Sequence, residues 1–164
     1  MKRILCFLAA IMLCVSLVSC GGTNDAKKAY TFRKGNVEIA IGDEVAPVLE
    51  ALGKWNDYDE KPSCGFSGIS KLYVYGSFEI ETYPMDGKDY VFRIELYDDS
   101  VATAEGVRIG QTKAQVIEAY GTPDVESSTM LTYRAENMYL RILISAEGLV
   151  SRIQYLHPNA VENN

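Results

Sequence analysis

Histidine and cysteine are scarce in this sequence, which limits the chemistry that it can support. The 164 residues include one histidine, His157, and four cysteines. A zinc site usually takes three or four nitrogen or sulfur ligands, so His157 and Cys64 would not complete one. The acidic segments 58–60 and 97–99 lack the spacing of a calcium loop and fit turns, and no glycine-rich nucleotide loop is present. We therefore expect no metal, no cofactor and no catalytic residue.

Positive charge is also in short supply. The chain has 16 lysines and arginines against 22 acidic residues, a formal net charge of −6. Nucleic-acid binding needs clustered lysine and arginine to neutralise phosphates, so we expect no nucleic-acid partner. Anionic lipid headgroups would also repel the folded part, so membrane attachment would have to depend on a covalent lipid.

The first 20 residues have the pattern of a lipoprotein signal peptide. Lys2 and Arg3 form a basic start, and residues 4–18 follow without a charge. A membrane-spanning helix needs about 20 apolar residues, and this run is shorter. Residues 17–20, Leu-Val-Ser-Cys, resemble the lipobox of bacterial lipoproteins, in which the cysteine receives a diacylglycerol. We predict that residues 1–19 are removed and that Cys20 is lipidated; an uncleaved helical anchor is the alternative.

These steps would leave Cys64 as the one free thiol, because Cys6 and Cys14 lie in the signal peptide. An intramolecular disulfide is then excluded. The thiol could be a buried small side chain, an intermolecular pairing site or a nucleophile, and burial is the commonest state of a free cysteine. His157 stands next to Pro158 near the C-terminal end, where we expect a solvated side chain. A dyad of Cys64 and His157 would need distant segments to meet.

Two stretches recur along the chain after residue 35. Ile41-Gly42 and the segment 48–53, VLEALG, return as Ile109-Gly110 and the segment 116–121, VIEAYG. Residues 20–35 are small, polar and charged, which favours a flexible tether. We therefore predict an α+β fold with two tandem repeats, residues 36–100 and 101–164. Each repeat is expected to be a short helical segment packed on an antiparallel sheet meander.

Local patterns predict the elements within each repeat. An apolar stripe at Val45, Val48, Leu49 and Leu52 predicts one helix, and the capping box of residues 112–115, TKAQ, predicts the start of another. Gly53 and Gly121 are expected to end these helices. Alternating or β-rich segments predict strands at residues 72–75, 78–83, 90–97, 131–133, 139–144 and 149–156.

Strand alternation divides the predicted sheets into two faces. Phe78, Ile80 and Thr82 share a face with Phe92, Ile94 and Leu96, under the helices. The opposite face is aromatic and charged, and tyrosine and arginine are common in protein interfaces. The alternative is a solvated face with cross-strand pairs of Glu and Arg. The candidate protein-binding residues on this face are Glu81, Tyr83, Arg93, Tyr97, Arg141 and Arg152.

The segment 107–116, VRIGQTKAQV, followed by Gly121-Thr122-Pro123, resembles small outer-membrane assembly lipoproteins of the SmpA/OmlA (BamE) type. Two such copies resemble the tandem-repeat β-lactamase inhibitor proteins (BLIP). The resemblance implies a repeated α+β fold over residues 36–157. Its motif is a helix cap and a helix stop, so it carries no chemistry, and the disulfides of the inhibitor proteins cannot form here. No inhibitory contact residue is carried over.

These features predict a cell-envelope lipoprotein whose duplicated domain is a non-catalytic protein-binding module. It would contact the membrane through the lipid on Cys20 and use its exposed sheet face for a protein partner of unknown identity. Its location would be outside the cytoplasm, on the outer leaflet of the plasma membrane, or on the outer membrane where two membranes are present. The alternatives are a passive structural lipoprotein without a specific ligand and a Cys64-dependent enzyme.

Replacing Cys20 by Ala should abolish lipidation and membrane retention, because Cys20 is the only acceptor in the lipobox. Metabolic labelling with a fatty-acid probe in a bacterial host measures this directly. Cys64→Ala is the control and should keep its label. Undiminished label in the Cys20 variant would show that the lipobox assignment is wrong.

Overall fold

The computed structural model describes residues 29–63 and 65–162, and these ranges contain ten strands and three short helices. Their order is β1 (Phe32–Lys34), β2 (Val37–Ile39), α1 (Val45–Leu52), β3 (Asp57–Pro62), β4 (Ile69–Val74), β5 (Phe78–Met85), β6 (Lys88–Leu96), α2 (Lys113–Tyr120), β7 (Val125–Glu126), β8 (Met130–Ala135), β9 (Met138–Ile144), β10 (Val150–Leu156) and α3 (Asn159–Glu162). No helix here exceeds eight residues.

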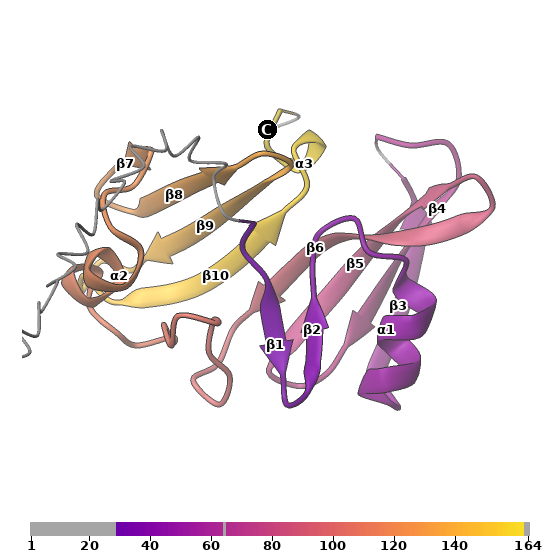
Figure 1. Cartoon of the computed structure of the whole chain (residues 1–164), viewed down its shortest axis with the longest axis horizontal. Helices are drawn as coiled ribbons and strands as arrows, with labels where there is room; N and C mark the ends of the chain where they lie inside the picture. Colours follow the sequence, from indigo (N-terminus) through magenta and orange to yellow (C-terminus); the bar gives the residue numbers. More distant parts are fainter. Residues whose placement is uncertain (1–28, 64, 163–164) are drawn as a thin grey trace, which may run out of the picture.

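Eight of the strands form one antiparallel sheet in the order β3-β4-β5-β6-β10-β9-β8-β7 (Figure 1). At its centre β6 pairs with β10, so that Leu96 lies opposite Ile153 and Ile94 opposite Tyr155. These four side chains are 1% exposed or less. The two halves of the chain therefore share one sheet and one core.

The prediction of an α+β fold with two tandem repeats is wrong. The protein is mainly β, and its principal sheet runs without a break through both halves (Figure 1). Periodicity in a sequence reports where a strand can form and which side it buries, but it does not report which strands pair. The pairing of β6 with β10, which joins distant parts of the chain, is therefore invisible to a local pattern.

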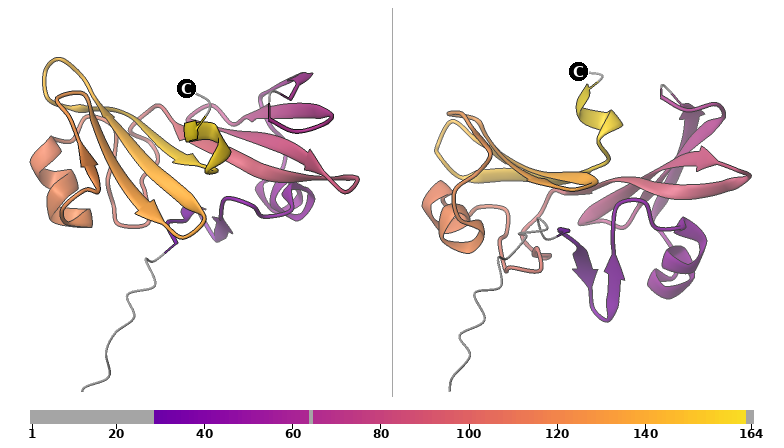
Figure 2. Two further views of the ribbon diagram at one scale, coloured as in Figure 1. Left: turned by 90° about the horizontal axis from the view of Figure 1, so that it is seen from above. Right: turned by 45° about the horizontal axis from the view of Figure 1, so that its top comes forward.

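One face of the sheet is covered and the other is largely open (Figure 2). Helices α1 and α2 and the β1–β2 hairpin lie on the covered side, whereas α3 stands on the opposite side. The buried cluster on the covered side extends from Val45 and Val48 of α1 to Val116 of α2. Full burial of one aliphatic side chain contributes about 1.5–3 kcal/mol, so this cluster is the main source of stability.

The fold begins before Asn36, the residue at which the sequence predicts its start. Phe32 in β1 is fully buried, and its ring centre lies 4.9 Å from that of Phe78 and 6.2 Å from that of Tyr155. The β1–β2 hairpin thus packs against the middle of the sheet. One buried aromatic residue in a short polar hairpin produces no periodicity, which explains why the sequence suggests a tether here.

The predicted signal peptide and Cys20 lie outside the described residues, and so does Cys64. Within residues 29–63 and 65–162, no helix is long and apolar enough to cross a membrane.

Both predicted helices are confirmed, and so is the capping box of α2. The Thr112 side chain accepts from the backbone N–H of Gln115, and the Gln115 side chain accepts from the backbone N–H of Thr112. Gly53 and Gly121 end the helices with φ of 78°, a conformation that favours glycine. A tyrosine hydroxyl donates to each of these glycine carbonyls, from Tyr75 just after β4 at 3.3 Å and from Tyr133 of β8 at 3.1 Å.

The six strands predicted from sequence are confirmed as β4, β5, β6, β8, β9 and β10, with shifted ends. Strand β3 is missed, because the sequence places residues 58–60 in a turn. All six residues of β3 are exposed, so the strand shows no alternation. Its charges and Pro62 are typical of a sheet edge that resists pairing with another chain.

The described residues contain no cluster of His, Cys, Asp and Glu that could hold a metal ion.

Truncating Ile153 to Ala should lower the free energy of unfolding by about 2–5 kcal/mol, the usual cost of removing a buried isoleucine side chain. Leu149→Ala is the matched control: Leu149 is 38% exposed, and its loss should cost about 1 kcal/mol or less. Urea denaturation measures both values. Equal losses would contradict a core centred on the joint between β6 and β10.

Candidate functional site

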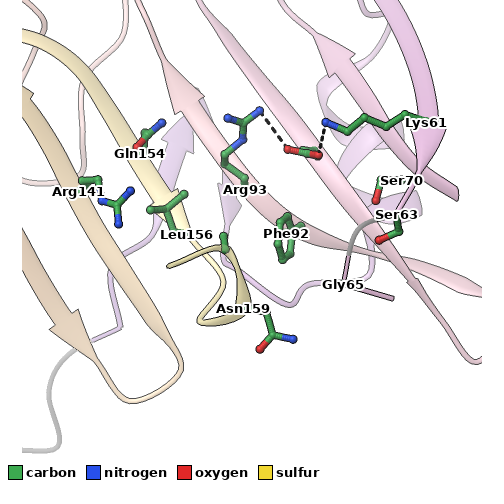
Figure 3. Close-up of a pocket in the computed structure, with 12 residues that line it drawn as sticks. Lys61, Ser63, Gly65, Ser70, Phe92, Arg93, Arg141, Gln154, Leu156 and Asn159 are labelled. Carbon is green, nitrogen blue, oxygen red and sulfur yellow. Dashed lines mark ion pairs between the residues drawn. The ribbon is translucent and has the colours of Figure 1, made fainter. Parts of the chain in front are cut away.

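The candidate site lies on the open face, where β5, β6, β9 and β10 bring polar side chains together. The register places Glu81 opposite Arg93 and Arg141 opposite Gln154. Directly opposed residues point to the same face of a sheet. These four residues line one cavity of about 370 Å³, which is within the usual size range of ligand sites (Figure 3). Its other lining residues are Lys61, Ser63, Gly65, Ser70, Phe92, Leu156, Asn159 and Ala160.

A bulge in β6 shapes this cavity. Thr82 lies opposite Val91 and Glu81 opposite Arg93, so Phe92 is an extra residue in β6. The bulge turns Phe92 to the open face together with Arg93, while Val91 stays buried in the core. The prediction that Phe92 points under the helices with Ile94 is therefore wrong, because strict alternation cannot anticipate an inserted residue.

Arg93 is the centre of a charged network on this face. Its guanidinium lies 3.0 Å from Glu79, 3.0 Å from Glu81 and 3.1 Å from Glu95. Glu95 is 6% exposed at its side chain, and it also pairs with Arg152 at 3.1 Å and accepts from Gln154 at 2.7 Å. A carboxylate this deeply buried has to be paired or hydrogen-bonded to remain ionised at low cost.

The acidic and basic side chains of this network balance one another in number. Its three carboxylates face Arg93, Arg152 and Lys61, whose Nζ is 3.0 Å from Glu81. Burial raises the pKa of Glu79 above its ordinary value, and the Arg93 guanidinium opposes that rise. Arg93 therefore favours the ionised form of Glu79.

Arg141 differs from Arg93, because no carboxylate among the described residues forms an ion pair with it. Its Nε is buried and has no hydrogen-bond partner in this part of the chain, and the same holds for the Nε of Arg93. Such unsatisfied buried donors are uncommon in folded proteins. The cavity therefore carries a positive charge that its own walls do not neutralise.

Aromatic rings form a wall beside the cavity. Phe66 stacks on Tyr83 at 4.3 Å between ring centres, and Phe92 stacks on His157 at 5.5 Å. His157 is thus partly buried, and the prediction of a solvated tail residue is wrong. Burial among these rings lowers the pKa of His157. The C-terminal segment folds back onto the sheet, where the His157 N–H donates to the Phe92 carbonyl at 2.9 Å.

The side-chain contacts of His157 bear on whether it could act as a base. Its Nδ1 accepts from the backbone N–H of Asn159 at 3.2 Å. In a neutral imidazole the other nitrogen, Nε2, then carries the proton and is a donor. In this arrangement Nδ1 is engaged by a backbone N–H and Nε2 is protonated, so neither nitrogen of His157 is placed to accept a proton from a thiol.

The residues predicted from sequence for this face are placed as follows. Glu81, Arg93 and Arg141 line the cavity, and Arg152 borders it through Glu95. Tyr83 is only 6% exposed because Phe66 covers it. Tyr97 lies farther along the sheet and donates to the Phe78 carbonyl at 3.3 Å.

Sequence reasoning missed several residues of the site. Strand alternation predicts Glu95 and Gln154 on the same face as Arg93 and Arg152, although neither is among the candidate binding residues. Phe66, Lys61 and Asn159 carry no such signal, since a loop, an edge strand and a short helix bring them to the cavity.

Among residues 29–63 and 65–162, the aromatic side chains do not form a broad exposed patch on the open face. Tyr83 is buried, and apart from Trp55 and Tyr58, whose ring centres lie 6.3 Å apart, the exposed large apolar side chains are scattered over several elements. The full set is Trp55, Tyr58, Ile69, Met85, Val125 and Leu149. Scattered apolar side chains are normal for a protein surface. Any recognition at this face thus depends on the charged cavity rather than on apolar area.

No family model matches the chain, and no curated protein matches its sequence. An extracellular protein containing an SCP domain from Bacillus anthracis str. Ames has a similar fold, with a TM-score of 0.56 and 10% identity over 74% of this chain and 45% of that chain. A cysteine-rich secretory protein from Staphylococcus aureus subsp. aureus Mu50 has a TM-score of 0.52 and 10% identity, over 74% of this chain and 46% of that chain. The uncharacterized protein yfeY from Escherichia coli has a TM-score of 0.44 and 14% identity, over 73% of this chain and 93% of that chain.

The resemblance to β-lactamase inhibitor proteins and to BamE-type lipoproteins is therefore wrong, since the similar folds are those of SCP-domain and cysteine-rich secretory proteins. The motif behind it, residues 112–115 with Gly121 and Pro123, is a helix cap and stop that unrelated folds also use. The chain spans less than half the length of the first two structures. At 10% identity the similarity is one of fold and carries no chemistry.

Replacing Arg93 by Ala should lower the free energy of unfolding at pH 7 by about 2–4 kcal/mol. This is somewhat less than the cost of breaking a fully buried pair, because the Arg93 side chain is 26% exposed. Without Arg93, the pKa of Glu79 should rise further. The loss should be full above that raised pKa and should shrink as the pH falls toward 4, where carboxylates take up protons. Urea denaturation at several pH values tests this, with Arg152→Ala as a milder control.

Proposed function

We propose that this chain is an exported, non-catalytic binding module that recognises a protein segment through the open face of its sheet. The observation that carries the proposal is the cavity at the centre of that face, where Arg141 brings a charge that the described side chains do not neutralise. The covered face is occupied largely by the helices and the hairpin of the chain itself (Figure 2).

Two observations support export. The solved structures of similar fold are described as an extracellular protein and as a secretory protein. The start of the sequence has the order of a lipoprotein signal peptide, with Cys20 as its acceptor. On this proposal the domain works outside the cytoplasm and is held to a membrane by the lipid on Cys20. Its acidic net charge keeps the folded part away from anionic headgroups.

Three features favour binding over catalysis. The carboxylates near the cavity are engaged by arginine and lysine, which lowers their value as general acids or bases. His157 accepts a backbone hydrogen bond at Nδ1 and packs among aromatic rings. The residues that line the cavity include donors of hydrogen bonds and apolar side chains, the usual composition of a recognition site.

Photo-crosslinking in cells of a bacterial host tests the proposal. A photoreactive phenylalanine analogue at Tyr97, on the open face, should give discrete protein adducts. The same analogue at Ile117, which packs against the core from α2, should give none. The lipid-anchored chain is used, so that membrane location is unchanged. Absence of adducts at Tyr97, or equal adducts at both positions, would instead support a passive structural lipoprotein.

A further inference from the structure

We infer that the cavity on the open face receives the carboxylate side chain of an acidic residue in an extended peptide segment, with Arg141 as its principal partner. The inference rests on the proposed function and specifies the chemistry of the partner. It stands on the distribution of charge around the cavity, on the Arg141 guanidinium that lines it and on the position of the cavity in the sheet.

The charge distribution identifies the cavity as a site for an anion. Glu81 is the only carboxylate among the described lining residues, and it is already engaged by Arg93 and Lys61 at 3.0 Å each. Figure 3 shows both of these ion pairs, whereas Arg141 stands on the other side of the cavity with none. An incoming carboxylate would therefore meet a cation that no acid of the described residues occupies.

The hydrogen-bond inventory points the same way. A guanidinium has five N–H donors in a planar fork that matches a carboxylate. The Nε of Arg141 is buried, so an incoming carboxylate would meet the terminal N–H groups of this side chain, which lines the cavity. Asn159 and Ser70 also line the cavity and bring an amide and a hydroxyl group to it. Bonds between charged partners are about twice as strong as neutral ones, so a carboxylate is a better occupant than an amide.

The apolar part of the lining explains why the ligand would be a side chain rather than a free ion. Phe92 and Leu156 flank the charged groups and can contact the methylene groups of a Glu or Asp side chain (Figure 3). The cavity lies over β5, β6, β9 and β10, at the middle of the sheet, and would receive one side chain of an extended segment. The negative net charge of the whole protein disfavours long polyanions at a distance.

The test uses three immobilised pools of pentapeptides with randomised flanking positions. One pool has Glu fixed at the centre and blocked ends, the second has Gln at the centre and blocked ends, and the third has central Gln with a free C-terminal carboxylate. Binding of the mature lipidated chain in detergent micelles is measured at about 0.1 M salt, where screening is moderate. We expect the Glu pool to bind about tenfold more tightly than the blocked Gln pool, the effect of one charged hydrogen-bonded contact.

Arg141→Gln should remove the preference for Glu, and Arg134→Gln should keep it. Arg134 is a matched control, because it lies on β8 opposite Tyr139, packs 5.9 Å from that ring and does not line the cavity. Equal binding of the two blocked pools, or a preference that survives Arg141→Gln, would overturn the inference. Stronger binding of the free-terminus pool would overturn the choice of a side chain.

The outcomes separate this inference from the proposed function. If no pool binds but Tyr97 still gives adducts in cells, the acidic ligand is wrong and the binding face stands. If the adducts are absent as well, the proposed function fails with it. Circular dichroism of the Arg141 variant shows that any loss of binding does not come from unfolding.

Discussion

The pairing of β6 with β10 is the contact on which the rest of the molecule depends. It places Leu96 against Ile153 and Ile94 against Tyr155, and it turns two sets of four strands into one sheet. The core beneath the sheet is continuous, and Phe32 from the hairpin packs at its centre. The same pairing brings Glu95 beside Gln154 on the opposite face. One set of backbone hydrogen bonds therefore creates both the core and the candidate site.

The open face shows how charged side chains can lie on a sheet with little exposure. Arg93 contacts three carboxylates, and a carboxylate with so little exposure is costly to bury without a cation beside it. The bulge at Phe92 allows an aromatic ring and a guanidinium to project from neighbouring positions of one strand. Without the bulge, Phe92 would point into the core and the cavity would lose its aromatic wall. Local backbone irregularity thus has a direct effect on the surface that a ligand would meet.

Fold and function separate clearly in this protein. Solved structures with similar folds share only 10% identity with it, and the match covers less than half of each of them, so they indicate an architecture and not an activity. The chemistry of the site comes from side chains of this chain: Arg141 without an acidic partner, a balanced network around Arg93 and a short C-terminal helix that closes one side. Substitutions of these residues can test the proposed function without reference to the proteins of similar fold.

The sequence by itself determined the local elements. The capping box at Thr112, the glycine that ends each helix and six of the strands follow from patterns within a few residues, because capping and alternation are short-range effects. It also indicated that Glu81, Arg93 and Arg141 share a face. Only the tertiary structure decided the single sheet, the burial of Phe32 and His157, and the cavity itself. These depend on strand pairing, a bulge and returning segments, which bring together residues far apart in the chain and leave no periodic trace in the sequence.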